Sequence, residues 1–331
     1  MSLEMPTRPI GSSKIEASVV GLGTWAIGGW MWGGTDEADS IAAVRASLDE
    51  GVSLIDTAPA YGQGLAEEIV GKAIRGRREK VVLATKCGLV WHTRKGNRFF
   101  DYDSGPVHRY LGRESIVHEV EQSLRRLGTD HIDLYITHWQ DPTTPVEETM
   151  EILVMLRDQG KINSIGASNL SEDELRTYAA TGSLDAIQEE YSMVKRDIET
   201  TLLPIAAKAG ISTLSYSSLA LGLLSGRMGP ERTFSGDDQR RDNPRFSPAN
   251  RAKVDRLMEA IAPVAEGHRA TKAQVVIAWT LRQSGITFAL CGARNPDQAR
   301  ENARAGRIRL STDEANAISD AVTTHLTNLD A

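Results

Sequence analysis

Four side chains of the kinds that move protons stand at or near the ends of short apolar segments. Asp56, Lys86 and His138 each close such a segment, and Tyr61 follows Asp56 by five residues. Each alone has an ordinary structural explanation. An aspartate after a strand often caps a helix, a tyrosine often lines the wall of a pocket, and a histidine often only makes a structural hydrogen bond. Only ten of the 38 basic residues are lysines, so a lysine at the end of a strand is not a typical surface residue. Together the four form a set suited to general acid–base catalysis, provided that the fold gathers them.

The elements that must position these residues alternate along the chain. Runs rich in β-branched residues are each followed by the apolar spacing of an amphipathic helix. We expect strands over residues 18–23, 52–55, 80–84, 131–136, 161–166, 186–189, 211–216 and 286–290. We expect helices over residues 36–50, 66–75, 113–127, 145–159, 171–180, 198–209, 251–266, 272–283, 297–305 and 313–322. Ser171 and Glu174 form a capping-box pattern, and residues 8–19 predict a short hairpin around Gly11.

This alternation predicts an α/β fold, in the form of a closed (β/α)8 TIM barrel in one domain over residues 1–331. Eight successive strand–helix units imply parallel strands with right-handed crossovers. A doubly wound open sheet is the alternative, but the glycines that end the first strand lead into more loop and not into a helix. In a barrel the hairpin would close the bottom, and the polar residues after the strands would meet at the top.

Three long connections follow strands, over residues 26–35, 87–112 and 217–250, and would therefore lie at the same end of the barrel. Aromatic residues gather in and beside the first two, namely Trp25, Trp30, Trp32, Trp91, Phe99, Phe100 and Tyr102. The third connection is polar and rich in arginine. An aromatic wall opposite a basic lid predicts an apolar pocket beside a phosphate-bearing ligand. The alternative for any single ring is that it packs a loop onto the barrel.

Composition excludes several classes of protein. Hydrophobic residues make up 40% of the chain and charged residues 25%, which is not the composition of a disordered protein. With a net charge of −6 and no long basic block, we expect no nucleic-acid partner. No apolar run approaches the roughly 20 residues of a membrane span, and residues 1–13 lack the apolar part of a secretory signal.

The cysteines and histidines point to a cytoplasmic protein without a metal site. Two cysteines, Cys87 and Cys291, cannot form a framework of disulfides, so we expect a reducing compartment. Cys87 stands next to Lys86, but we expect a small buried apolar residue there and not a nucleophile. The histidines show no metal-ligand spacing, so no metal is expected.

Six short segments, in order along the chain, resemble the motifs of the aldo-keto reductases. They are residues 54–62, 85–86, 136–139, 165–169, 214–226 and 292–298. The resemblance runs from about residue 8 to residue 322, and six motifs in order are far more specific than any one of them. Residues 23–34 resemble in particular the bacterial branch of sugar and general aldehyde reductases.

The resemblance implies reduction of an aldehyde, ketone or sugar carbonyl by NADP(H), on a small-molecule carbonyl or alcohol substrate, in a monomer or small homo-oligomer. Hydride delivery leaves an alkoxide that needs a proton, which Tyr61 would donate. Asp56 would hold Lys86 charged, and His138 would hydrogen-bond the carbonyl oxygen. An ammonium about 4 Å away stabilises a phenolate by about 4 kcal/mol at an effective dielectric of about 20. We therefore expect Lys86 to lower the pKa of Tyr61, less what desolvation takes back.

The resemblance also assigns a cofactor site and a substrate pocket. The nicotinamide and its ribose would contact Thr24, Trp25, Asp56, Ser168, Asn169, Gln188 and Tyr216. The pyrophosphate and adenosine would contact Ser217, Leu219, Leu221, Gly226, Arg240, Gly292, Arg294, Gln298 and Asn302. The substrate pocket would be lined by Trp25, Trp32, Trp91 and Trp139.

Some of these assignments have alternatives. Ser168 and Asn169 could instead cap the helix that begins near Ser171, and Arg294 could be a surface charge. If Arg294 binds the 2′-phosphate, as its place after the last strand indicates, NADPH is the preferred cofactor. Two other functions stay open. A Schiff-base aldolase would use Lys86 as its nucleophile, and a cofactor-sensing regulatory subunit would bind the nucleotide without turnover.

Overall fold

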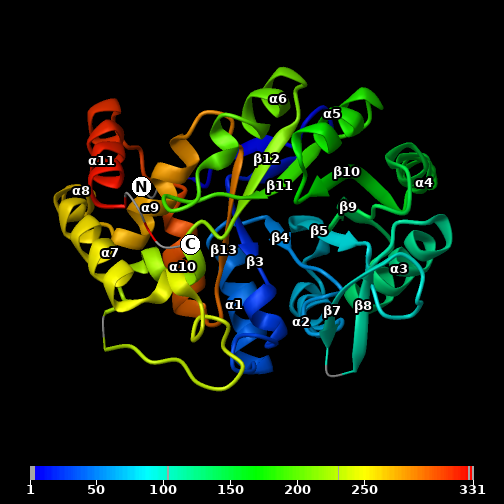
Figure 1. Cartoon of the computed structure of the whole chain (residues 1–331), viewed down its shortest axis with the longest axis horizontal. Coiled ribbons are helices and arrows are strands. Elements are labelled where there is room, and N and C mark those ends of the chain that lie inside the picture. Colours follow the sequence, from blue (N-terminus) through cyan, green and yellow to red (C-terminus); the bar gives the residue numbers. More distant parts are fainter. Residues whose placement is uncertain (1–3, 103, 230, 327–328, 330–331) are drawn as a thin grey trace.

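The strands of the chain close into a barrel, as the alternation predicts (Figure 1). A computed structural model describes residues 4–102, 104–229, 231–326 and 329. Eight parallel strands pair in the order β10-β11-β12-β13-β3-β4-β5-β9. They are β3 (Val20–Gly23), β4 (Leu54–Asp56), β5 (Val82–Cys87), β9 (Ile132–Thr137), β10 (Ile162–Ser168), β11 (Ala186–Glu190), β12 (Ser212–Tyr216) and β13 (Phe288–Gly292).

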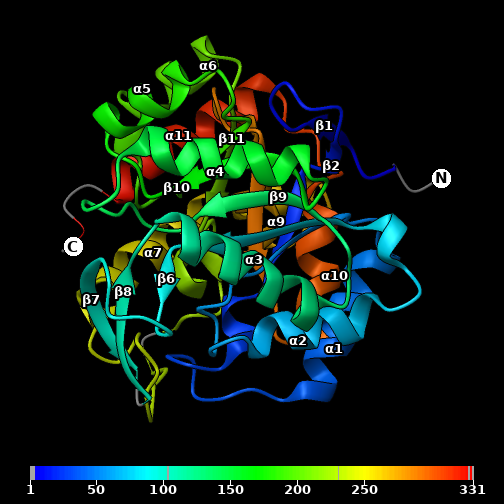
Figure 2. The same cartoon turned by 90° about the vertical axis from the view of Figure 1, so that its right-hand side faces the viewer.

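Helices surround the barrel between successive strands (Figure 2). They are α1 (Glu37–Asp49), α2 (Leu65–Ile74), α3 (Arg113–Leu127), α4 (Val146–Asp158), α5 (Glu172–Ala180), α6 (Leu202–Lys208), α7 (Pro248–Ala260), α8 (Ala262–Gly267), α9 (Lys272–Arg282), α10 (Pro296–Ala305) and α11 (Thr312–His325). The expected capping box of α5 is present, because Ser171 and Glu174 bond each other's backbone N–H. No helix in the described part of the chain is long and apolar enough to cross a membrane.

Two helices differ from the expected boundaries, and prolines explain both. The helix expected over 251–266 is divided into α7 and α8, because Pro263 has no N–H and its ring crowds the carbonyl four residues earlier. The helix expected over 198–209 begins only at Leu202. Pro204 stands in its first turn and is tolerated there, but it prevents the α-helix from continuing upstream. A short 3₁₀ turn, Asp197–Glu199, precedes it.

The bottom of the barrel is closed by the expected hairpin. β1 (Thr7–Pro9) and β2 (Glu16–Ser18) pair antiparallel. Ile10, in the turn, is fully buried and packs with residues of the barrel interior such as Leu54 and Phe288. The turn needs a glycine, since Gly11 has φ +52° and a Cβ there would lie 2.2 Å from the Asp185 carbonyl oxygen. The hairpin therefore plugs the end of the barrel opposite the ends of the strands that carry the polar residues.

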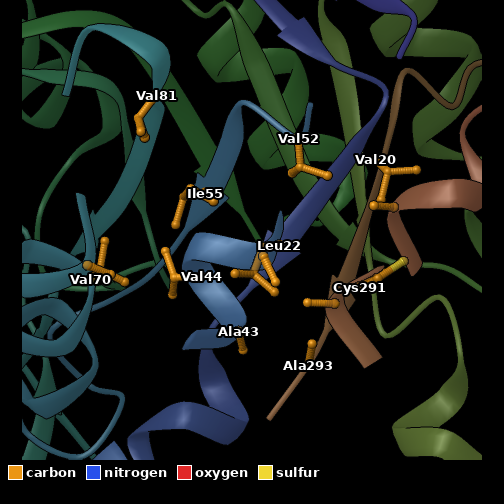
Figure 3. Packing of buried hydrophobic residues seen from close by; sticks show 14 of the residues in the cluster. Val20, Leu22, Ala43, Val44, Val52, Ile55, Val70, Val81, Cys291 and Ala293 are labelled. Atoms are coloured by element: carbon orange, nitrogen blue, oxygen red, sulfur yellow. The ribbon is translucent and has the colours of Figure 1, made fainter. Parts of the chain in front are cut away.

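Apolar packing between the strands and the outer helices makes the barrel a rigid support. Leu22 on β3, Ile55 on β4 and Val44 on α1 are buried in one cluster (Figure 3). Each fully buried aliphatic side chain of this size contributes about 1.5–3 kcal/mol relative to exposure. Gly23 pairs with Asp56 across β3 and β4, so the strand that carries Asp56 is held within this frame.

A small sheet replaces the loop expected over residues 87–112. It consists of β6 (Leu89–Val90), β7 (Asn97–Tyr102) and β8 (Gly105–Arg109), paired antiparallel in the order β6-β8-β7. Figure 2 shows β7 and β8 standing beside the barrel. The sequence of β7 has no alternation of apolar and polar residues, and its pairing with β8 shifts register between Arg98 and Phe100. Without that alternation the periodicity that identifies strands is missing.

Candidate active site

Lys86 lies at the centre of the four residues expected to act together. Its Nζ donates to both carboxylate oxygens of Asp56, at 2.8 and 2.9 Å, and to the Thr57 carbonyl oxygen at 2.9 Å. It also donates to the Tyr61 phenolic oxygen at 3.2 Å, so its three hydrogens are shared among four acceptors. Lys86 is fully buried, so none of these bonds competes with bulk water. The strands place the pair, because Asp56 ends β4 and Lys86 stands near the end of the adjacent β5.

Tyr61 is held in the turn between β4 and α2. Its N–H donates to the Ala58 carbonyl oxygen at 3.1 Å. The following residue, Gly62, has φ +67°, and a Cβ there would lie 2.3 Å from the Gly28 carbonyl oxygen. Only glycine therefore fits beside Tyr61. Because Lys86 donates to the phenolic oxygen, the hydrogen of the phenol itself remains available to an acceptor in the cavity.

The pKa of Tyr61 corrects our expectation from the sequence. Burial first, and the Asp56 carboxylate second, raise the pKa of the Tyr61 phenol well above its usual value. Lys86 donates to the phenolic oxygen, but both oxygens of Asp56 bind the same ammonium, so the phenol faces an ion pair instead of a lone cation and the net shift is upward. Tyr61 is thus protonated at neutral pH, which suits a proton donor.

His138 follows β9 and faces the same space. Its ring lies 5.8 Å from the ring of Tyr61, nearly perpendicular to it. Burial, and then the charge of Lys86, hold the pKa of His138 well below its usual value. The imidazole is therefore neutral at neutral pH and can donate one hydrogen bond without adding charge. These four residues, Asp56, Tyr61, Lys86 and His138, are here called the tetrad. They comprise one ion pair, Asp56 with Lys86, and two neutral side chains.

A cavity of about 720 Å³ opens over the tetrad. Its size is that of a pocket for a large organic ligand. Most of the expected site residues line it: Trp25, Trp32, Asp56, Tyr61, His138, Trp139, Ser168, Asn169, Gln188, Tyr216, Ser217, Leu219, Leu221, Arg240, Gly292, Arg294, Gln298 and Asn302. Lys86 lies behind Tyr61 and is not part of the lining.

Three expected residues besides Lys86 do not line the cavity. Trp91 stands just after the end of β6, where the chain leaves the small sheet, so its ring is not part of the pocket. Thr24 is fully buried and does not reach the cavity. Its backbone N–H donates to the Asp56 carbonyl oxygen at 3.0 Å. Gly226 ends a 3₁₀ segment and packs against the side chain of Lys272.

Several lining residues were not assigned to the site from the sequence. They are chiefly Trp30, Met31, Leu89, Phe99, Phe100, Arg227, Arg232 and Glu301. Trp30, Phe99 and Phe100 belong to the aromatic set noted in the loops, but only the fold of the small sheet shows which rings face the cavity. Glu301 directly precedes Asn302 on α10, and that adjacency is the signal that could have identified it.

The side-chain amides expected to hold a nicotinamide bond to residues of the active site instead. Gln188 Nε2 donates to Asp56 Oδ1 at 2.8 Å. Asn169 Nδ2 donates to the His138 carbonyl oxygen at 2.9 Å, and Tyr216 OH donates to Asn169 Oδ1 at 2.7 Å. Ser171 is the N-cap of α5, so neither Ser168 nor Asn169 is the cap of that helix.

The arginines at the cavity are already engaged by the protein. Arg240 forms two bonds with Asp238, at 2.9 and 2.6 Å, and its guanidinium lies 5.1 Å from the ring of Trp32. Arg227 pairs with Glu301 at 2.8 Å. Arg240 lines the cavity, and Asp238 already offsets its charge, so its closure over a pyrophosphate stays a prediction.

Arg294 and Asp237 join the loops over the cavity. Arg294 donates to the carbonyl oxygens of Trp32 and Gly34 at 3.0 and 2.7 Å. Asp237 accepts from the backbone N–H groups of Met31 and Gly33 at 2.9 and 3.0 Å. The aromatic loop and the arginine-rich loop are thereby fastened to each other and to the start of α10.

Two buried polar atoms in the cavity lining lack a hydrogen-bond partner among the described residues. They are Trp32 Nε1 and Glu301 Oε1. Such atoms are costly unless a ligand or water completes them. The lining as a whole, which includes the amides of Asn169 and Gln188 and the guanidinium of Arg294, suits an elongated ligand with polar groups, such as a dinucleotide. No group of three metal-ligating side chains is found in the described residues.

The cysteines are buried and unpaired with each other. Cys87 and Cys291 are free thiols with almost no exposed surface. Burial, and for Cys87 also the Glu119 carboxylate, raise the pKa of both thiols. A thiol that stays protonated is a poor nucleophile, so Cys87 is the small buried residue that the sequence predicts.

Comparisons with known proteins agree with this geometry. A sequence model described as the aldo/keto reductase family matches residues 19–323. The aldo-keto reductase YhdN of Bacillus subtilis is 47% identical over 298 residues, covering 87% of this chain and 85% of that protein. The NADH-specific methylglyoxal reductase of Escherichia coli is 40% identical over 318 residues, covering 94% and 97%. A solved glycerol dehydrogenase from Gluconobacter oxydans matches with a TM-score of 0.87 and 37% identity, covering 98% and 97%. The chain therefore belongs to the aldo/keto reductase family.

Proposed function

We propose that the protein reduces the carbonyl group of aldehydes, ketones or sugars to the alcohol with NADPH as the reductant. The observation that carries the proposal is the chain of hydrogen bonds from Asp56 through Lys86 to Tyr61, which opens into the cavity. The reduced nicotinamide supplies a hydride when bound. Tyr61 gives its phenolic proton to the carbonyl oxygen, and Lys86 stabilises the phenolate that remains.

The residues of the cavity divide the work of holding cofactor and substrate. Ser168, Asn169 and Gln188 would exchange their mutual bonds for bonds to the carboxamide, and the Tyr216 ring would lie against the nicotinamide. Arg294 would hold the 2′-phosphate at the other end of the cofactor. His138, neutral and beside Tyr61, would donate to the carbonyl oxygen and so fix its distance from the phenol.

A direct test follows the absorbance of NADPH and of NADH with a panel of aldehydes, ketones and sugars. Methylglyoxal belongs in the panel because a relative is named for it, and glycerol oxidation tests the reverse direction for the same reason. We expect steady turnover with NADPH. Tight cofactor binding without turnover of any carbonyl would instead support a regulatory, cofactor-sensing role.

The geometry around Lys86 argues against a Schiff-base aldolase. A nucleophilic amine needs a free lone pair, whereas the Lys86 ammonium is held by two carboxylate oxygens, a carbonyl and a phenol. Burial lowers the pKa of Lys86, but Asp56 opposes that shift. Borohydride treatment in the presence of an aldehyde should therefore leave Lys86 unmodified.

A further inference from the structure

The wall of the cavity beside the tetrad is aromatic. Four rings form it: Trp30, Phe99, Phe100 and Trp139, here called the aromatic cup. Phe99 lies 5.1 Å from Trp139, and Phe100 stacks on Trp30 at 5.3 Å with an interplanar angle of 19°. The cup contains no charged side chain. A substrate group that enters it therefore meets flat apolar surfaces.

A β-bulge creates this arrangement. Arg98 pairs with His108 and Phe100 with Val107, so Phe99 is an extra residue in β7. In a regular strand two successive side chains point to opposite faces, but both phenylalanines line the cavity. Bulges next to active sites commonly redirect a side chain in this way. The bulge thus turns Phe99 toward the cavity.

The small sheet is tied to the turn that carries Tyr61. Tyr102 OH donates to the Ala60 carbonyl oxygen and accepts from the Gly62 N–H. Those two residues flank Tyr61 in the chain. The ring of Tyr102 also packs on Trp30, with centroids 4.1 Å apart. The aromatic cup is therefore fixed relative to the proton donor.

Phe99 is itself held in place although it is exposed. The residue is 39% exposed, and it is the one exposed large apolar residue among those that the structure describes. The Arg109 guanidinium lies 5.0 Å from its ring, and Trp139 contacts it from the cavity side. Trp139 directly follows His138 in the chain. A carbonyl placed between Tyr61 and His138 would extend its substituent beside Trp139 and Phe99.

We propose that Phe99 is the specificity-determining residue of this site and that it selects carbonyl substrates carrying a flat apolar group, such as aryl aldehydes. The selection rests on the proposed carbonyl reduction and adds a substrate class to it. A flat ring can pack against the surface that the contacting rings of Phe99 and Trp139 present to the cavity, and aromatic pairs gain more than their buried area alone. Small aldehydes reach Tyr61 without touching Phe99 and so gain nothing from it.

The test compares benzaldehyde, cyclohexanecarbaldehyde and propanal in the intact enzyme and in Phe99→Ala and Phe99→Leu. Phe99→Ala should lower kcat/KM for benzaldehyde about tenfold, or about 1.4 kcal/mol, through a higher KM with little change in kcat. Propanal should change less than about twofold, which also shows that the variant is folded. Phe99→Leu keeps an apolar contact but cannot stack. Its kcat/KM should therefore stay nearly unchanged for cyclohexanecarbaldehyde and fall for benzaldehyde.

Arg98→Ala is the matched control, because Arg98 is the exposed neighbour of Phe99 in β7 and its guanidinium pairs with Asp101. It should leave all three substrates unchanged. Equal losses for benzaldehyde and propanal in Phe99→Ala, or no loss for either, would overturn the role of Phe99 and leave carbonyl reduction standing. Absence of turnover with every aldehyde in the unmutated enzyme would instead overturn the proposed function itself.

Discussion

The Lys86 ammonium donates to the phenolic oxygen of Tyr61 across 3.2 Å while Asp56 holds the same nitrogen with both carboxylate oxygens. The direction of this hydrogen bond decides what Tyr61 can do. Its oxygen already accepts one hydrogen, so its own hydrogen is free for a substrate oxygen. Since the pKa of the phenol is raised, that hydrogen is present throughout the neutral range.

Tyr61→Phe removes the proton donor and leaves the ring. We expect turnover to fall by roughly 10²–10⁴-fold, the usual contribution of a positioned general acid. Cofactor affinity, measured by titration of the protein with NADPH, should stay close to that of the unmutated enzyme. Tyr110→Phe is a control, because its phenol bonds Glu114 outside the cavity. Near-normal turnover of Tyr61→Phe would remove Tyr61 from the role.

Lys86→Met should abolish turnover and also destabilise the protein. It leaves the Asp56 carboxylate buried without its cation, and breaking a buried ion pair from one side costs about 3–5 kcal/mol. The double variant Asp56→Asn/Lys86→Met removes both charges, so it should recover much of the thermal stability and none of the activity. Unfolding curves and kcat for each variant check this prediction. If the double variant recovers neither stability nor activity, or recovers both, the prediction is wrong.

Much of the fold follows from local pattern. The alternation of strands and helices indicated parallel strands, and eight units favoured a closed barrel over an open sheet, so the barrel and its hairpin plug were predictable. The capping box of Ser171 and Glu174 was likewise local. The division of α7 from α8 was not expected, although its signal is local, because Pro263 stands inside the helical pattern and cannot donate a backbone hydrogen bond.

What the sequence could not show depends on contacts between distant segments. The bulge at Phe99 exists only as a register shift between β7 and β8. The pairing of Arg240 with Asp238 is close in sequence, but its contact with Trp32 depends on how two loops meet. The sign of the Tyr61 pKa shift required both the burial of the phenol and the position of Asp56, neither of which is a property of one motif.

Glu119 should give the protein a stability that falls as pH rises. Burial raises the pKa of Glu119 from 4.5 to about 8, although its carboxylate accepts from the Gly88 N–H at 3.0 Å. Between these two values the folded state keeps a proton that the unfolded state releases. Stability is therefore fully present below the lower value and declines up to the higher one, by at most about 1.4 kcal/mol per pH unit.

Glu119→Gln removes this titration and keeps an amide oxygen for the Gly88 N–H. Unfolding curves at about pH 5 and about pH 8 should differ less in the variant than in the unmutated protein. Glu121→Gln on the same helix is the control, because Lys161 lowers the pKa of that carboxylate and it does not titrate in the window. An unchanged pH dependence in Glu119→Gln would contradict the assignment. Glu189, whose pKa burial also raises to about 8, leaves a residual slope in both variants.

Arg294 should make the enzyme prefer NADPH over NADH by at least about tenfold. Its guanidinium binds two carbonyl oxygens and keeps further N–H groups for a 2′-phosphate. A charge-assisted bond of this kind contributes about 1.5–3 kcal/mol, which corresponds to about 10- to 160-fold in affinity. Asp297, the nearest acidic residue in the sequence, is almost fully exposed and pairs with Arg300. Arg240 binds Asp238 and is the main cause of its lowered pKa, to which the nearby charge of Arg294 also contributes.

Arg294→Ala should weaken NADPH binding and leave NADH binding nearly unchanged. The same change also releases the loop at Trp32 and Gly34, and that loss would affect both cofactors alike. Asp237→Ala separates the two effects, because it frees the same loop at Met31 and Gly33 without removing a cation. We expect it to weaken both cofactors by similar factors. The Escherichia coli relative is named as NADH-specific, so both cofactors must be measured. Equal dissociation constants for NADPH and NADH in the unmutated protein would show that Arg294 serves only to fasten the loop.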